Sequence, residues 1–164
     1  MATVSIRITR DDITPAFKRL TKMGRDTTPV MRSMGNTFKS ITEGNFNAAG
    51  AGYRPSAWPA KRDGSPSNLK QSGLLWHSFH LTVTKDTATL ANPTPYAAIH
   101  QFGGTISGKP LLKFKVGDRW VSKHQVTMPS RPFYPVKDGQ LIPSAEQLIA
   151  AAGMRTVERI AEGK

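Results

Sequence analysis

The segment Gly103-x-x-x-x-Gly108-Lys109 has the residue types and spacing of a phosphate-binding loop up to its last position. Such a loop requires serine or threonine after the lysine, because that hydroxyl holds the magnesium ion of the bound nucleotide. Pro110 stands there instead, and proline offers neither a hydroxyl nor an amide hydrogen to a phosphate. The segment is therefore predicted to be a flexible connector and not a nucleotide site.

Four histidines are further candidates for chemistry: His77, His80, His100 and His124. His77 and His80 are three residues apart and could meet on one face of a helix. Zinc normally takes three or four protein ligands. The chain has no cysteine, and no further histidine stands at a spacing that would place it beside this pair. We therefore predict no metal site and no cofactor, and interpret the histidines as polar or partly buried side chains.

The serines and carboxylates show no sequence pattern typical of a catalytic site. The chain has no Gly-x-Ser-x-Gly elbow, which would expose a serine nucleophile. Several carboxylates stand next to a basic residue, as in Arg62-Asp63, Lys85-Asp86 and Lys137-Asp138, a pattern typical of solvated turns. An enzyme acting on cell wall or nucleic acid would require clustered titratable groups in a pocket. We predict that the chain is not an enzyme.

A basic segment that contains one tryptophan is a stronger candidate for binding. Residues 111–128 alternate apolar and polar side chains on either side of Gly117-Asp118, which predicts a β-hairpin with a type II′ turn. The candidates for contact with DNA or with an acidic partner are Lys113, Lys115, Arg119 and Lys123. Such a ribbon could lie along phosphates; alternatively, the lysines protect an exposed strand edge from unwanted pairing. An exposed Trp120 would decide between these readings.

Length and composition bound the class of protein. The chain has 164 residues, 38% of them hydrophobic and 21% charged, which is ordinary globular usage and predicts a single domain over residues 1–164. The absence of cysteine excludes disulfides and thiolate sites. No stretch approaches the roughly 18 apolar residues of a membrane span, and no signal segment is recognised. We expect a protein made in the cytoplasm, without a membrane partner.

Net charge is the strongest compositional clue. The chain has 23 basic and 11 acidic residues, a net charge of +12 and a pI near 10.4. The excess is uneven, since residues 1–40 carry eight basic and three acidic side chains and residues 140–164 carry three of each, and no run of like charges forms a basic tail. An anionic partner is favoured, with a merely solubilising surface as the alternative.

Two helices are predicted near the N-terminus, after a short strand over residues 3–8 in which apolar and polar side chains alternate. Thr14-Pro15 and Thr28-Pro29 each place a capping residue before a proline at the first helical position. The second helix is predicted to continue to Asn47, a length of about 28 Å.

Shorter elements follow: a helical turn over residues 73–78, strands over 80–84 and 87–91, and a helix over 96–102. Tyr96, Ile99 and Phe102 have helical spacing and are expected to pack the last of these on a sheet. Ser144 and Gln147 form a capping-box pattern that begins a closing helix. The elements together predict an α+β fold, in which an antiparallel sheet with a β-hairpin packs against two main helices.

Residues 48–72, which connect the second predicted helix to the helical turn over residues 73–78, have no periodic pattern and are rich in Gly, Pro, Ser and Ala. A loop of about 25 residues is long for a compact domain, and such loops are usually functional. Tyr53, Trp58 and Leu69 are its isolated apolar anchors. We predict an assembly arm laid on a neighbouring subunit, so that deletion of residues 50–70 should abolish assembly and leave the fold intact.

Three short elements, in order, resemble the tailed-phage virion-morphogenesis (tail-completion) family. Residues 96–104, Tyr-Ala-Ala-Ile-His-Gln-Phe-Gly-Gly, resemble its Tyr-Ala-x-x-His-Gln-Phe-Gly segment. Residues 72–78 are similar to its Thr-Gly-x-Leu-x-x-Ser element, although Ser72 stands where threonine is usual. Residues 129–133, Pro-Ser-Arg-Pro-Phe, resemble its Pro-x-Arg-Pro-Phe element. The resemblance covers about residues 53 to 161.

The resemblance implies a non-catalytic structural subunit of the phage neck or tail top, which completes the tail or joins the head to it. It implies a hexameric ring around the DNA channel of the virion, made in the host cytoplasm. The partners would be further copies, other neck and tail proteins and, non-specifically, genomic DNA. The alternative from another class is a free nucleic-acid-binding protein that uses the hairpin 111–128.

Candidate subunit-interface residues lie in the arm and in the His-Gln motif: Tyr53, Arg54, Trp58, Lys61, His100 and Gln101. For His100 and Gln101 two roles remain open. Their side chains could bond the arm or a neighbouring subunit, or they could cap backbone groups within one chain. Arg131-Pro132-Phe133 is interpreted as a rigid turn that places Phe133 in the core.

Overall fold

The computed structural model describes residues 13–47, 52–61 and 64–164. Its helices are α1 (Ile13–Arg25), α2 (Thr28–Gly44), α3 (Leu74–His77), α4 (Ala97–Phe102) and α5 (Pro143–Glu162). Its strands are β1 (His80–Val83), β2 (Ala88–Ala91), β3 (Gly104–Val116), β4 (Arg119–Met128), β5 (Val136–Lys137) and β6 (Gln140–Leu141). Helices and antiparallel strands confirm the predicted α+β class. The strand predicted over residues 3–8 lies outside the described residues.

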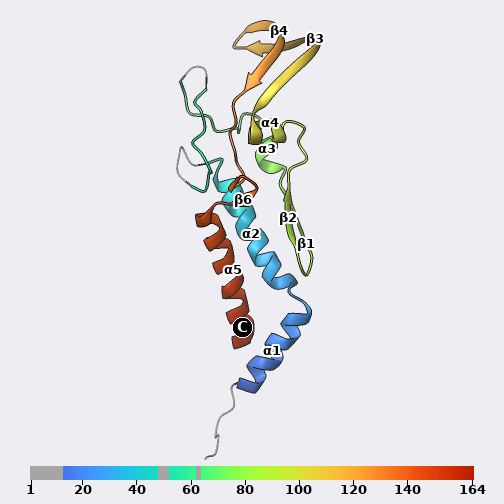
Figure 1. Cartoon of the computed structure of the whole chain (residues 1–164), viewed down its shortest axis with the longest axis vertical. Coiled ribbons are helices and arrows are strands. Elements are labelled where there is room, and N and C mark those ends of the chain that lie inside the picture. The colour runs from blue at the N-terminus through green and yellow to red at the C-terminus, as the bar shows by residue number, and fades with distance from the viewer. Residues whose placement is uncertain (1–12, 48–51, 62–63) are drawn as a thin grey trace, which may run out of the picture.

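The molecule is elongated, with α1 at one end and the β3–β4 hairpin at the other (Figure 1). α2 lies in the middle and packs against α5 on one side and against the β1–β2 hairpin on another. Two glycines permit these close contacts. A Cβ at Gly35 would meet Leu81 Cδ1 at 2.9 Å, and a Cβ at Gly153 of α5 would meet Met34 Sδ at 3.0 Å.

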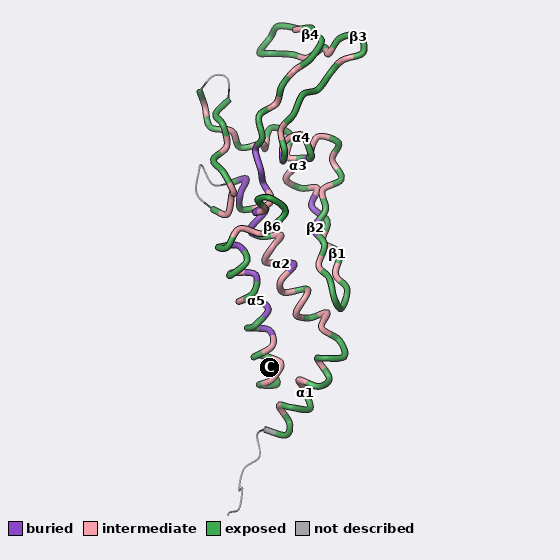
Figure 2. The backbone as a smooth tube through the Cα atoms, viewed as in Figure 1, coloured by how far each residue is buried: buried purple, intermediate pink, exposed green. Residues whose placement is uncertain are grey.

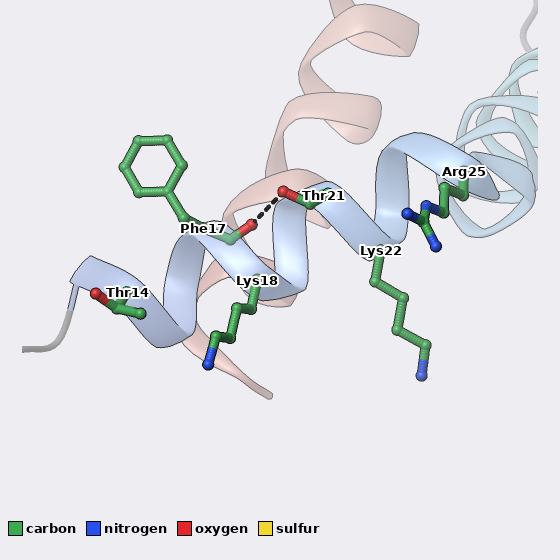
Figure 3. Close-up of a pocket in the computed structure, with 6 residues that line it drawn as sticks. All are labelled: Thr14, Phe17, Lys18, Thr21, Lys22 and Arg25. Carbon is green, nitrogen blue, oxygen red and sulfur yellow. Dashed lines mark hydrogen bonds between the residues drawn. The ribbon is translucent and has the colours of Figure 1, made fainter.

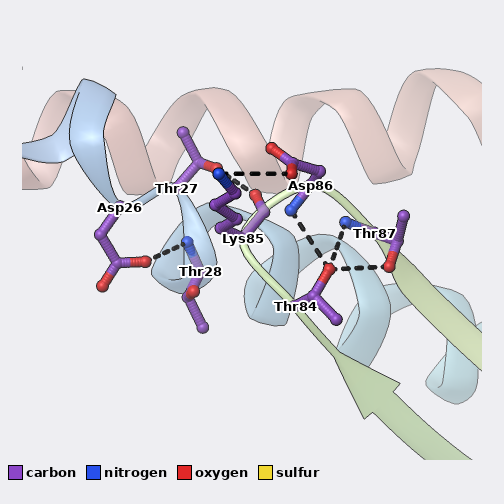
Figure 4. A network of polar contacts seen from close by, with 7 residues as sticks. All are labelled: Asp26, Thr27, Thr28, Thr84, Lys85, Asp86 and Thr87. Carbon is purple, nitrogen blue, oxygen red and sulfur yellow. Dashed lines mark hydrogen bonds and ion pairs between the residues drawn. The ribbon is translucent and has the colours of Figure 1, made fainter.

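The two N-terminal helices begin within one residue of the predicted Thr-Pro starts, at Ile13 and Thr28, but α2 ends at Gly44 and not at Asn47, and its cap differs from the predicted one. The N-cap position is Thr27, whose side chain makes no capping bond. Instead, Asp26 Oδ1 accepts a hydrogen bond from the Thr28 amide at 3.0 Å (Figure 4). The Thr27 hydroxyl is free to donate to the carbonyl of Lys85 in the β1–β2 turn. The corner between α1 and α2 is therefore tied to that turn.

The closing helix also begins differently from its prediction. α5 starts at Pro143, with Ile142 as N-cap in extended conformation and no side-chain capping bond. The capping box at Ser144 is thus wrong, because Pro143 already occupies the first helical turn, where its missing amide hydrogen costs nothing. The predicted amphipathic face is present, and the buried residues of α5 are Ala145, Ile149, Ala152, Gly153 and Thr156.

The strands do not form one sheet. They pair as three two-stranded antiparallel sheets, β1–β2, β3–β4 and β5–β6. In β3–β4 the prediction of a flexible connector over residues 103–110 is wrong, because Gly104–Ser107 pair with Gln125–Met128 and only the following residues leave the register. At the far end Gly117 has a φ of 60°, as the first position of a type II′ turn requires.

The core is centred on aromatic side chains. Phe46 and Phe133 are fully enclosed, with their ring centroids 5.4 Å apart, and Phe79 lies 5.9 Å from Phe46 and 5.7 Å from Phe133. Figure 2 shows buried residues where α2, α5 and the segment before β5 come together, and none along the hairpin. Phe133 is therefore in the core, as the rigid-turn interpretation predicted.

Candidate functional site

The β3–β4 hairpin has two chemically different faces. Cross-strand partners share a face, so the pairs Leu112–Lys123, Phe114–Val121 and Val116–Arg119 make one face and the pairs Lys113–Ser122 and Lys115–Trp120 make the other. The four predicted basic contacts are thus divided. Lys113 and Lys115 lie beside Trp120, whereas Arg119 and Lys123 flank a row of apolar side chains. We call these the basic face and the apolar face.

Neither face is covered by the rest of the described chain. Within residues 104–128 neither strand has a buried residue. Trp120 is 75% exposed, and Val116 is exposed as well. Protection of a strand edge needs lysine but no exposed tryptophan, so the exposure of Trp120 favours contact with a partner.

The first part of the arm is fixed to its own chain through Asn45, at the end of α2. The Asn45 side chain is buried; its Nδ2 donates to the Phe133 carbonyl and its Oδ1 accepts from the Tyr53 amide, both at 2.9 Å. Arg54 Nε donates to the Asn45 carbonyl at 2.8 Å. Burial lowers the pKa of Arg54, and its guanidinium lies 3.8 Å from the centre of the Trp58 ring.

Trp58 belongs to the core. Its ring meets Phe46 edge-on at 5.7 Å, and its Nε1 donates to the Pro132 carbonyl at 2.8 Å. Deletion of residues 50–70 would remove this contact with Phe46 and is therefore expected to lower stability, while the survival of the fold after it stays a prediction. Lys61, by contrast, is exposed. The described residues of 48–72 contain no helix or strand, and their contact with a neighbouring subunit stays a prediction.

His100 and Gln101 face the interior. The Gln101 side chain is buried, and its Oε1 accepts from the amides of Phe133 and Tyr134, both at 3.0 Å. Gln101 thus caps backbone within the chain, one of its two predicted roles. His100 accepts a 2.6 Å hydrogen bond from the Arg131 amide at its carbonyl, and its Nδ1 is buried with no hydrogen-bond partner among the described residues. Burial, and then the charge of Arg131, lower the pKa of His100.

An exposed phenylalanine lies next to this motif. Phe102 was expected to pack α4 on a sheet, but its side chain is 79% exposed. The helix ends there, at Gly103, which turns the chain toward β3. Phe102 instead lines a surface groove of about 490 Å³ together with Pro55, Pro132, Tyr134 and Val136. The expectation is therefore wrong for Phe102, which packs against no sheet of the described residues.

A second basic surface, which the sequence reasoning did not single out, lies on α1. Lys18, Lys22 and Arg25 are exposed and line, with Phe17, a surface pocket of about 470 Å³. Figure 3 shows the two lysines extending from the same side of the helix. Their spacing of four and three residues could have identified this face, since such residues are neighbours on a helix.

The histidines do not form a metal site in the described residues. His77 ends α3 and His80 begins β1, so they do not share a helix face as their spacing had allowed. Across the described parts of the chain, no group of three or more potential metal-binding side chains occurs. No helix among these residues combines the length and apolarity needed to cross a bilayer.

Comparisons with known proteins agree with the order of motifs. The sequence profile of the phage virion morphogenesis family matches residues 8–150. Over 122 residues, 74% of this chain and 75% of the other protein, the sequence is 32% identical to the Mu-like prophage FluMu G protein 2 of Haemophilus influenzae. No solved structure matches significantly. A profile match over most of the chain, together with a relative of this similarity, shows that the chain belongs to the phage virion morphogenesis family.

Proposed function

We propose that this chain is a non-catalytic structural subunit of the phage neck or tail top, where it completes the tail or joins the head to it. It acts as a hexameric ring around the DNA channel. The observation that carries the proposal is the β3–β4 hairpin. It has apolar side chains and an exposed Trp120, but no buried residue between 104 and 128, so the fold of one chain does not account for its composition.

A ring requires heterologous contacts, in which two different patches of each subunit are complementary. The apolar face of the hairpin is one candidate patch. The groove lined by Phe102 and Tyr134 is the other, because it is concave and largely apolar in its side chains. Arg119 and Lys123 flank the first patch, while Lys137 and Asp138 both line the second, so the proposed complementarity rests on the apolar side chains and not on charge.

In this arrangement the basic face of the hairpin points away from the contact and toward the channel. Lys113 and Lys115 are exposed, and exposed lysines attract phosphates through screened, non-specific interactions. Weak attraction of this kind suits passage of DNA, whereas a tight clamp would hinder it.

Two neighbouring residues of β4 give a matched test. Val121 lies on the apolar face and Ser122 on the basic face, and neither is buried. Val121→Asp should abolish the ring and the production of infectious particles, while Ser122→Asp should leave both intact. Native mass spectrometry of purified protein with tails, and complementation of a phage that lacks the gene, measure the two outcomes. Normal rings formed by Val121→Asp would refute the proposal.

The alternative, a free nucleic-acid-binding protein, is favoured by one observation, the pairing of Lys115 with the exposed Trp120 across the hairpin. Basic side chains beside an aromatic ring suit single-stranded nucleic acid. Binding of DNA by the isolated monomer, measured against salt, separates the two functions. Sub-micromolar affinity that depends on Trp120 would support the alternative, and weak binding that disappears at physiological salt would support the channel subunit.

A further inference from the structure

A second surface pocket lies between the end of the arm and the Arg-Pro-Phe turn. It has a volume of about 570 Å³, and the charged and polar residues that line it are Lys61, Ser67, Asn68, Lys70, Gln71 and Arg131. Three of these carry a positive charge, and none of the described lining residues carries a carboxylate. The volume is within the range of sites that bind small ligands or peptide side chains.

Arg131 is the unusual member of this set. Its exposed fraction is only 8%, although arginine is almost never so buried unless it is paired. Its two hydrogen bonds, from Nε to the Pro59 carbonyl and from Nη2 to the Ala60 carbonyl, are long, at 3.3 and 3.4 Å. Because a guanidinium has five N–H donors, three remain for another acceptor. No carboxylate of the described residues lies within ion-pairing distance of it.

The remaining lining is held in place by the arm itself. Leu69 has a φ of 53°, a left-handed conformation that is rare for a bulky residue, and its side chain packs against the aromatic core. Lys70 is fixed on two sides, since its Nζ donates to Asn47 Oδ1 and lies 4.0 Å from the centre of the Trp76 ring. Lys70 is thus positioned before any ligand arrives, whereas Lys61 is exposed at the rim of the pocket.

We propose that this pocket binds a carboxylate of an acidic protein segment, through Arg131 with support from Lys61. Arg131 is largely buried with two long hydrogen bonds to backbone carbonyls and no carboxylate partner among the described residues, and an anion that enters the pocket would add charge-assisted hydrogen bonds. Phosphates on the convex surface of a duplex reach protruding cations, such as those of the hairpin. A recessed guanidinium is reached by a carboxylate at the end of a side chain or of a polypeptide.

This site goes beyond the proposed function and rests on it in one respect only, that the acidic segment belongs to another protein of the particle. It is distinct from the ring contact, because none of the residues that line the groove beside Phe102 lines this pocket. A subunit could therefore hold a neighbour through its hairpin and a different protein through Arg131.

The test uses the full chain and a tri-glutamate peptide, followed by NMR or by tryptophan fluorescence. Wild-type protein should bind the peptide and not tri-glutamine. Arg131→Gln should weaken binding about tenfold, the equivalent of a hydrogen bond to a charged group, and Lys61→Ala about threefold. Lys85→Ala, a variant of an exposed lysine in the β1–β2 turn, is the control and should bind as wild type does.

Lys61 is exposed, so Lys61→Ala keeps the test decisive even if Arg131→Gln lowers stability. Failure of wild type to bind tri-glutamate at millimolar concentration would overturn the inference, as would equal binding by wild type, Arg131→Gln and Lys61→Ala. Binding of duplex DNA or inorganic phosphate with this residue dependence, in place of tri-glutamate, would overturn it too. None of these results affects the ring contact, which the Val121→Asp variant tests separately.

Discussion

The aromatic core and the β3–β4 hairpin both contain apolar and aromatic side chains, but these are buried in the core and uncovered in the hairpin. Around Phe46 and Phe133 the apolar rings are enclosed, and polar groups such as the Asn45 amide bond the backbone that surrounds them. In the hairpin, Phe114 and Trp120 are not buried, and lysines alternate with the apolar side chains along the strands. The core is covered by the chain's own folding, whereas the hairpin is left uncovered by the rest of the described chain, which the proposed ring contact would explain. Substitutions should therefore affect stability in one region and assembly in the other.

The largest loss of stability is expected from Phe133→Ala. Phe133 is completely buried and touches the rings of Phe46, Phe79 and Tyr134, so its truncation should lower the free energy of unfolding by about 3–5 kcal/mol. Urea denaturation followed by circular dichroism measures the change. A loss below about 1 kcal/mol, typical of a surface substitution, would show that this region is not the core.

A smaller loss is expected where the arm joins the core. Trp58→Ala should cost about 2–3 kcal/mol, because it removes both the edge-on contact with Phe46 and the hydrogen bond to Pro132. Trp58→Phe keeps a ring and loses the Nε1 donor, so about 1 kcal/mol is expected. The same denaturation experiment compares them. Identical stability of both variants and wild type would mean that the arm is not anchored here.

The sequence predicted the helices well because Thr-Pro pairs and apolar spacing act locally. It placed Phe133 in the core and found the hairpin with its turn. It did not predict that Gln101 would cap the Phe133 and Tyr134 amides, since these groups are 32 and 33 residues apart and meet only in the folded chain. The pocket around Arg131 was not predicted either, because Lys61 and Arg131 are far apart in the sequence and line one pocket only in the folded chain.

The pH dependence of stability tests the environment of His100, which lies at the edge of the core. The pKa of His100 lies below its ordinary value of 6.5, through burial and the charge of Arg131. As the pH falls below 6.5 the unfolded state takes up a proton before the folded state does, so the free energy of unfolding should decrease. Thermal unfolding at several pH values tests this. His100→Gln, which cannot be protonated, should flatten the slope; an unchanged slope would assign it to other groups.

The smallest effect on stability, and the sharpest contrast with Phe133, is expected from Trp120→Ala. Because Trp120 is 75% exposed, the free energy of unfolding should change by no more than about 0.5 kcal/mol, as for other surface substitutions. The melting temperature should shift correspondingly little. Particle production should nevertheless fall, and complementation measures it. If Trp120→Ala unfolded the protein, the hairpin would belong to the structural core and the comparison between the two regions would fail.

Gly35 and Gly153 lie outside the three short motifs at residues 72–78, 96–104 and 129–133, yet they allow α5 and the β1–β2 hairpin to approach α2 closely. A methyl group at Gly35 would collide with Leu81, and one at Gly153 would press on Met34. A mutational scan of the whole gene should find Gly35 less tolerant than Gly153, because the Cβ of Ala88 also lies 3.0 Å from a methyl group added at Gly35, whereas the flexible Met34 side chain can move away from one added at Gly153.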